Sequence, residues 1–268
     1  MTLPAILSNR LRLPVVASPL LTVSNPELVI AQCKAGIVGS FPAINARPRE
    51  DLDIWLTRIK TALVRHDRQY PGQPSAPFAV HQIVRRSNAR LAHDMEVIAR
   101  HRVPIVITSL EARPEINDAI HAYGGIVLHD AADNRSAREA IDKGADGLIA
   151  VSAGAGRQGG TQSPFARVQE IRRWFDGPLL LSGSIASGQS IFGATAMGAD
   201  LAYVGSAFIA TREANAAQAS GPGIGVSRDL PGAGELIDRF AAEYEAARNE
   251  FLWRMEDAVE PRWAASAT

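Results

Sequence analysis

Short apolar runs alternate along the chain with longer stretches in which apolar residues recur at helical spacing. Eight runs rich in Val, Ile and Leu predict strands, at 13–19, 36–41, 77–83, 103–110, 125–131, 147–153, 178–184 and 201–208. Helices are predicted at 25–35, 50–66, 88–101, 113–123, 134–143, 163–175, 188–197 and 235–257. Regular alternation of strands and helices predicts an α/β protein with a parallel sheet.

Eight β–α units and a length of 268 residues match a single (β/α)8 TIM barrel. The strand runs are almost continuously apolar, as is typical of parallel strands that helices cover. A doubly wound open sheet has the same rhythm, but the count of eight and the even composition favour the barrel. We therefore expect one domain over 1–268, with an irregular segment rich in Gly and Pro at 216–234 before the last helix.

Glycine follows several of the predicted helices, in the segments AYGG, DKGA, FDGP and AMGA. Many helices end with a residue in the left-handed conformation, which glycine adopts without strain. We therefore predict that these four segments mark helix ends with a left-handed glycine.

Composition excludes several classes of partner and site. The formal net charge is zero, so neither nucleic acid nor an acidic membrane is an expected partner. Cys33 is the only cysteine, and its apolar position in a helix favours a place in the core over a role as nucleophile. The sequence has no HExxH, CxxC or Walker pattern, so we expect no catalytic metal. No apolar run reaches the ~18 residues of a membrane span, and we expect a cytoplasmic protein.

The carboxyl ends of the predicted strands are polar or small, although the strand bodies are apolar. They read Ser18-Pro19-Leu20, Phe41-Pro42, His81-Gln82, Thr108-Ser109, His129-Asp130, Ser152, Ser182-Gly183-Ser184 and Gly205-Ser206. Because a TIM barrel carries its chemistry at this end of the strands, we predict a ligand site there. Adjacent residues of a strand face opposite sides, which favours a structural role for His129-Asp130.

Two glycine turns follow the seventh and eighth strands. Gly183 and Ser184 lead into a predicted helix, and Gly205 and Ser206 lie at the same level of the barrel. Backbone N–H groups of two adjacent turns, with a helix N-terminus nearby, form a phosphate cradle. Ordinary βα turns are the alternative interpretation of the glycines alone.

Nine segments carry a resemblance when taken together in order: PVVASPL, GIVGSFPAINARP, VRRSNARL, HRVPIVITSL, AYGGIVLHD, GADGLIAVSAGAG, SPF, GPLLLSGSIASG and AMGADLAYVGSAFIATREANA. The chain resembles the nitronate monooxygenase family, formerly called 2-nitropropane dioxygenases, which are flavin enzymes built on a TIM barrel. The resemblance implies FMN, with its phosphate on Gly183, Ser184, Gly205 and Ser206. It further implies that the cofactor contacts Ser18, Pro19, Leu20, His81, Val151, Gly156 and Val204.

The chain departs from the family at the mouth of the barrel. The family's loop after the sixth strand ends in a histidine that points at flavin and substrate, and that position is Gln158 here, preceded by Arg157. A glutamine amide forms hydrogen bonds but does not titrate, so it cannot be a general base. His81 stands where the family usually has asparagine, Glu111 where it has glycine, and the segment 216–234 is shorter than the family's substrate-side segment.

Three hypotheses follow from these residues. The first is an FMN-dependent oxidoreductase that oxidises alkyl nitronates with O2, with Arg157 and Gln158 contacting the anion. The second is a flavin-dependent enoyl or quinone reductase on the same scaffold, and the third is a non-catalytic relative. The first two require a small-molecule substrate, either a nitronate or another small electron donor or acceptor. The sequence leaves a homo-oligomer open.

Overall fold

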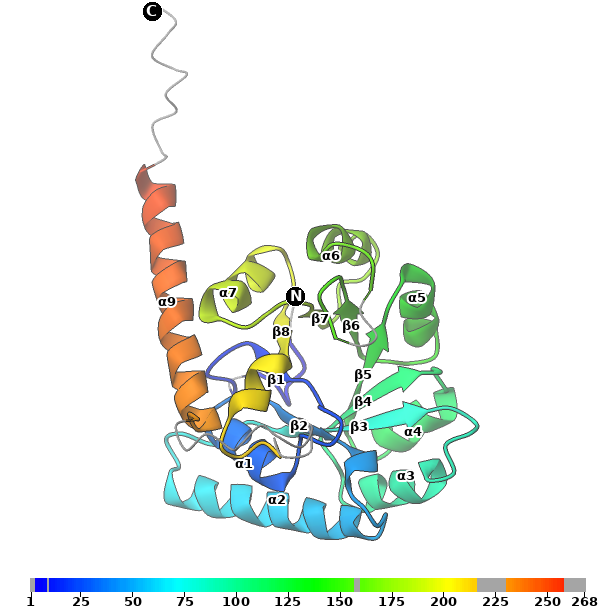
Figure 1. Cartoon of the computed structure of the whole chain (residues 1–268). Coiled ribbons are helices and arrows are strands. Elements are labelled where there is room, and N and C mark those ends of the chain that lie inside the picture. Colours follow the sequence, from blue (N-terminus) through cyan, green and yellow to red (C-terminus); the bar gives the residue numbers. More distant parts are fainter. Residues whose placement is uncertain (1–2, 9, 157–159, 216–229, 258–268) are drawn as a thin grey trace, which may run out of the picture.

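Eight parallel strands form a barrel that is ringed by helices (Figure 1). The computed structural model of the chain describes residues 3–8, 10–156, 160–215 and 230–257. The strands pair in the order β1-β8-β7-β6-β5-β4-β3-β2. A parallel bridge between Val16 and Val38 brings β1 and the start of β2 together and closes the ring. The predicted (β/α)8 TIM barrel is thus confirmed.

Each predicted strand and helix is present, with ends shifted by a few residues. The strands are β1 (Val15–Ala17), β2 (Gly39–Pro42), β3 (Phe78–Val84), β4 (Ile105–Leu110), β5 (Ile126–Ala131), β6 (Gly147–Val151), β7 (Leu179–Ser182) and β8 (Leu201–Val204). The helices are α1 (Pro26–Lys34), α2 (Asp51–Gln69), α3 (Leu91–Arg100), α4 (Pro114–His121), α5 (Asn134–Asp142), α6 (Pro164–Arg172), α7 (Gly188–Ala196) and α9 (Ala233–Asp257). Two short 3₁₀ helices, η1 (Ala43–Asn45) and η2 (Ser206–Ala210), follow β2 and β8.

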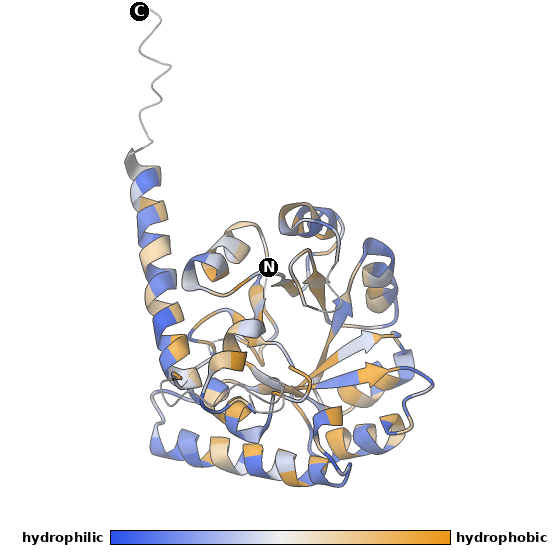
Figure 2. Cartoon of the chain, viewed as in Figure 1, coloured by the Kyte–Doolittle hydropathy of each residue, from blue (hydrophilic) through white to orange (hydrophobic). Residues whose placement is uncertain are grey.

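The alternation of side chains along each strand divides the core in two. On β5, Leu128 belongs to a cluster inside the barrel, whereas Val127 and Ala131 belong to a cluster between barrel and helices. The helices complete the outer cluster with one apolar face, and α2 shows hydrophilic and hydrophobic residues side by side along its length (Figure 2). The barrel wall is therefore apolar on both sides, as its continuous apolar runs predict.

Glycine ends three helices as predicted, but not the fourth. Gly124, Gly144 and Gly198 have positive φ angles of 86°, 93° and 106°. The prediction is wrong for Gly177, whose φ is not positive, because α6 ends at Arg172 and a further turn separates the two. Gly36, after α1, takes the left-handed conformation instead, with φ of 89°.

The last helix, α9, packs along α7 and α1 and then runs on past the barrel (Figure 1). Its backbone lies so close to the start of α7 that a Cβ on Gly188 would lie 2.3 Å from the carbonyl oxygen of Phe240. The Phe192 ring of α7 packs on Tyr244 and Phe251 of α9 at centroid distances of 5.7 Å each. Among the described helices, none is both long and apolar enough to cross a membrane.

Candidate active site at the barrel mouth

A ring of polar side chains lies at the mouth, directly above the apolar interior of the barrel. The buried apolar layer inside the barrel ends with Val16, Val38, Ala79, Ile107, Leu128, Ile149, Leu180 and Tyr203. Two residues further along each strand, the next inward-facing positions are Ser18, Ser40, His81, Ser109, Asp130, Val151, Ser182 and Gly205. Six of these eight positions carry polar side chains, the exceptions being Val151 and Gly205, and we call the eight together the polar ring. Only two of them, His81 and Asp130, carry titratable side chains.

His81 is held in place from one side of its ring. Its Nε2 lies 2.9 Å from the hydroxyl oxygen of Ser109 on the next strand. Its Nδ1 is buried and has no hydrogen-bond partner within the described part of the chain. Burial, followed by the nearby His129 imidazole, lowers the pKa of His81 to about 4, so the ring is neutral at physiological pH.

His129 and Asp130 face opposite sides of the barrel wall. The Nδ1 of His129 lies 2.8 Å from the hydroxyl of Thr108, and both side chains are buried on the outer face. Asp130 points inward and is partly exposed, with its Oδ1 buried and unpartnered among the described residues. Burial raises the pKa of Asp130 to about 7. The predicted structural role therefore suits His129, whereas Asp130 belongs to the polar ring.

Tyr203 lies just below the polar ring. Burial, and next the charge of Asp130, raise the pKa of the Tyr203 phenol well above its usual value, while a hydrogen bond with Ser18 opposes the shift. These three side chains therefore lie close together, although β5 and β8 are not neighbours in the sheet. The phenol remains protonated at any physiological pH, so it can take part in hydrogen bonds but cannot act as a base.

The turns after β6 and β7 pack directly on each other. Gly154 and Gly183 have φ angles of 84° and 144°, and Ser184 has φ of 53°. The N–H of Ser184 donates to the carbonyl oxygen of Gly154 over 3.2 Å. A Cβ on Gly183 would lie 2.3 Å from the hydroxyl oxygen of Ser152. The close contact between the two turns is therefore enough to explain why residue 183 is glycine.

Gly205 is different, because its neighbours leave room for a side chain. Its φ of −114° is negative, although its ψ of −80° lies outside the helical and extended regions. A Cβ there would lie 3.4 Å from the Cβ of Ser18 and 3.5 Å from Leu20, which is ordinary contact. Within the described residues, the N–H groups of Gly205 and Ser206 make no hydrogen bond. The missing side chain thus leaves open space beside two unused backbone donors.

The helix after β7 does not offer a free N-terminus. Ser187 and Ser190 form a capping box at its start. The N–H of Gly188 donates to Oε2 of Glu243, on α9, over 2.7 Å. The helix N-terminus that we expect near the β7 turn is present, but residues of the chain itself fill it. Unused donors remain at the β8 turn, where η2 begins.

The remaining predicted residues are placed as follows. Pro19 and Leu20 are partly buried at the rim, and Gly156 is exposed. Val204 turns its side chain into the outer cluster, so only its backbone faces the mouth. Arg157 and Gln158 lie outside the described residues. Sequence reasoning did not find Tyr203, although its place two residues before Gly205 on β8 marks it as inward-facing.

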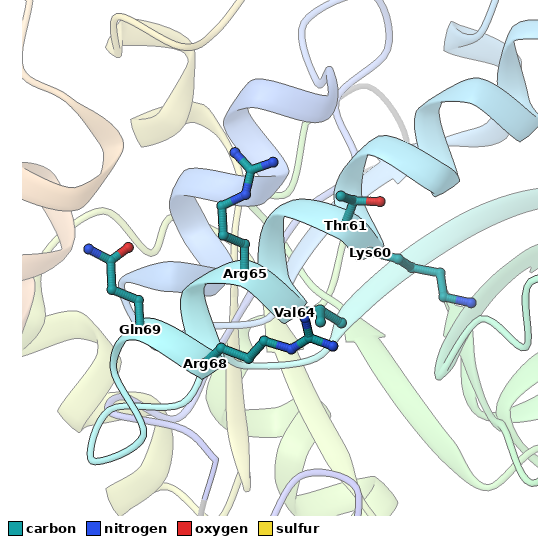
Figure 3. Close-up of a pocket in the computed structure, with 6 residues that line it drawn as sticks. All are labelled: Lys60, Thr61, Val64, Arg65, Arg68 and Gln69. Atoms are coloured by element: carbon teal, nitrogen blue, oxygen red, sulfur yellow. The ribbon is translucent and has the colours of Figure 1, made fainter.

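Two hollows on the surface lie away from this site. One has a volume of about 630 Å³ and is lined by six residues of the second half of α2 (Figure 3): Lys60, Thr61, Val64, Arg65, Arg68 and Gln69. The other, of about 390 Å³, includes Phe78 and Pro104, at the amino ends of β3 and β4. Both belong to the end of the barrel opposite the polar ring. No group of three His, Cys, Asp or Glu suited to a metal ion occurs in the described part of the chain.

The sequence of residues 6–221 matches the family model of nitronate monooxygenase. The chain belongs to the nitronate monooxygenase family. Membership places it among flavin-dependent oxidoreductases built on a TIM barrel. A curated relative from Rhodococcus jostii (strain RHA1) is a (3aS,4S,5R,7aS)-5-hydroxy-7a-methyl-1-oxo-octahydro-1H-indene-4-carboxyl-CoA dehydrogenase, 23% identical over 200 residues. That match covers 75% of this chain and 53% of the relative, so the chain spans about half the relative's length.

Solved structures of two further proteins share the fold. The nitroalkane oxidase of Streptomyces ansochromogenes superposes with a TM-score of 0.75 at 20% identity, covering 92% of this chain and 100% of that one. FabK of Thermotoga maritima gives a TM-score of 0.66 at 22% identity, covering 76% of this chain and 61% of that one. Identities this low establish the barrel and nothing finer.

Proposed function

We propose that this protein is an FMN-dependent oxidoreductase that oxidises alkyl nitronates with O2. The observation that carries the proposal is family membership together with the polar ring at the carboxyl ends of the strands. A polar layer above an apolar interior suits a planar cofactor that needs hydrogen bonds at its edges and apolar contact on its face.

The residues present fit FMN. Unused N–H groups and open space at Gly205 and Ser206 suit a phosphate, and Gly183 and Ser184 lie in the adjacent turn. Seven further residues would contact the rest of the cofactor: Ser18, Pro19, Leu20, His81, Val151, Gly156 and the backbone of Val204. FMN would supply the group that takes electrons from the substrate and passes them to O2.

The substrate we propose is a small anion. A nitronate is already deprotonated, so its oxidation requires no base at position 158. By the family resemblance, the Arg157 guanidinium would attract the nitro group and the Gln158 amide would hydrogen-bond its oxygens. Both residues fall outside the described ranges, so their part rests on the sequence alone.

The absorbance spectrum of the purified protein tests the cofactor, and rates with ethyl nitronate under air test the substrate. We expect flavin bands in the blue and near-UV, and oxygen uptake that depends on nitronate. A colourless protein that takes up no added FMN would instead support the non-catalytic relative. A flavoprotein that NADH reduces rapidly and nitronate does not would support the enoyl or quinone reductase.

A further inference from the structure

We propose that Asp130 is the proton acceptor of this site, which extends its substrates from nitronates to neutral nitroalkanes. The α-carbon of the nitroalkane loses a proton to a carboxylate oxygen of Asp130. The C–H bond breaks, its electron pair remains on the substrate, and the substrate becomes the nitronate. This inference rests on the proposed function, because oxidation of that nitronate is the step that follows.

Position is the first argument. Asp130 is the only carboxylate among the eight positions of the polar ring, and it lies at the carboxyl end of β5. Side chains at this end of a TIM barrel face bound substrate. The inward direction is fixed by alternation, because Leu128 lies inside the barrel and His129 is bound to Thr108 outside it.

The second argument is that Asp130 has no structural partner among the residues that the structure describes. Two other half-buried carboxylates in this barrel, Asp200 and Asp146, have hydrogen-bond partners. Asp200 accepts from Arg172 over 2.6 Å and from the backbone of Leu179 over 2.8 Å. Asp146 accepts from the backbone of Val127 over 2.7 Å and lies 2.8 Å from His121.

Asp130 makes no hydrogen bond within the described part of the chain, and its Oδ1 is buried without one. The side chain is still partly exposed, and because Oδ1 is buried, Oδ2 is the oxygen open to the mouth. A buried carboxylate without partners is destabilising, so its presence in this ring calls for a use.

The third argument concerns the groups that face Asp130 from the other strands. These are His81 on β3 and Tyr203 on β8, and the remaining ring members do not titrate. The pKa of His81 is lowered to about 4 by burial and then by His129, so it is too weak a base near neutral pH. The Tyr203 phenol stays protonated. Asp130, whose pKa burial raises to about 7, is the group in the ring suited to accept a proton there.

The test compares Asp130→Asn with the native protein, both loaded with flavin, on nitroethane and on ethyl nitronate. We expect Asp130→Asn to lower kcat/KM for nitroethane by about 10²- to 10⁴-fold, the usual contribution of a general base. Activity on the nitronate should fall far less, because that substrate has already lost its proton. Native kcat/KM for nitroethane should rise with pH through a midpoint near 7, and this rise should vanish in the variant. Asp142→Asn, an exposed carboxylate on α5, is the matched control and should behave as the native protein.

A second measurement does not depend on oxidation. Without O2, the native protein should exchange the deuterium of α-deuterated nitroethane with water, followed by NMR, and Asp130→Asn should not. No exchange by the native protein, or equal exchange by both proteins, overturns the role of Asp130. If exchange is seen and depends on Asp130 but neither protein oxidises ethyl nitronate, the proposed function fails while the role of Asp130 stands.

Discussion

The backbone N–H of Gly188 donates a hydrogen bond of 2.7 Å to the carboxylate of Glu243, which ties the start of α7 to the middle of α9. A carboxylate at a helix N-terminus satisfies an unpaired donor and interacts favourably with the helix dipole. Removal of its charge should therefore loosen the seam between the two helices.

We predict that Glu243→Gln lowers the free energy of unfolding by about 1–2 kcal/mol, measured by urea denaturation. Glu245→Gln is the control, because among the described residues Glu245 pairs with exposed Arg248 on the same helix and with no other cation. That substitution should change stability by less than about 0.5 kcal/mol. Equal effects of the two substitutions would mean that the contact with α7 contributes nothing.

Asp130→Asn should stabilise the fold at neutral and alkaline pH. Burial raises the pKa of Asp130 from 3.8 to about 7, so the folded protein holds a proton that the unfolded chain releases between these values. The free energy of unfolding of the native protein should fall by at most about 4 kcal/mol as pH rises from about 4 to about 7, and should then level off. In Asp130→Asn this fall should be absent. Thermal unfolding of both proteins from pH 4 to pH 9 tests this prediction. If stability varies with pH in the same way in both, the Asp130 carboxyl is exposed to water in the folded protein.

Gly205→Asp should reduce flavin retention more than Gly205→Ala. A Cβ fits here, since it would lie 3.4 Å from the Cβ of Ser18, so the alanine variant should fold and keep cofactor. A carboxylate beside the unused N–H groups of the β8 turn would repel a phosphate. Gln158→Ala should leave flavin content close to native. The ratio of flavin to protein absorbance measures all three, and full flavin content in Gly205→Asp would argue against a phosphate at this turn.

Gln158→His should restore activity on neutral nitroalkanes to the Asp130→Asn protein. Imidazole has an ordinary pKa of about 6.5 and accepts a proton near neutral pH. The double variant should act on nitroethane with a rate that rises through the pKa of the new histidine, while its rate on nitronate changes little. Neighbouring Arg157 would move that rise to lower pH. If flavin is bound and the rate on nitroethane does not recover, position 158 does not reach the substrate.

Cys33 should be unreactive until the protein unfolds. Its thiol is completely buried in α1, and burial raises its pKa to about 12. Because the thiolate is the reactive form, a thiol reagent at pH 8 should label the native protein slowly and the urea-unfolded protein fully. Asp142→Cys, which adds an exposed thiol, should gain one rapidly labelled group in the native state. Rapid labelling of native Cys33 would show that α1 opens from the barrel.

Local patterns predicted the barrel well because each β–α unit carries its own signal. The period-two alternation alone places His129 and Asp130 on opposite faces, and it predicts the inward direction of Tyr203. Contacts between distant segments could not be predicted in this way. Glu243 accepts a hydrogen bond from the N-terminus of α7 although it lies 55 residues further along the chain, and no local pattern near Gly188 predicts this contact.

Because contacts between distant segments cannot be predicted from local patterns, the sequence did not reveal the surroundings of Asp130. The resemblance implies roles for residues that match the family, whereas the opposite facing of adjacent strand residues favours a structural role for the pair His129-Asp130. That Asp130 lacks a partner among the described residues depends on what β3 and β8 place across the barrel, which only the three-dimensional arrangement reveals. Gly177 failed for a simpler reason, because α6 ends before the turn that contains it.

The seam between β1 and β8 sets the order in which this barrel can be built during synthesis. Val15 pairs with Ala202, so the first strand finds its last partner only when most of the chain has left the ribosome. Strands β2 to β7 can pair one after another as they emerge, but their inward apolar side chains stay uncovered until closure. Such late closure of distant strands is slow. Until β8 is available to pair with β1, the apolar inner faces of the other strands are exposed, which favours aggregation of the incomplete chain.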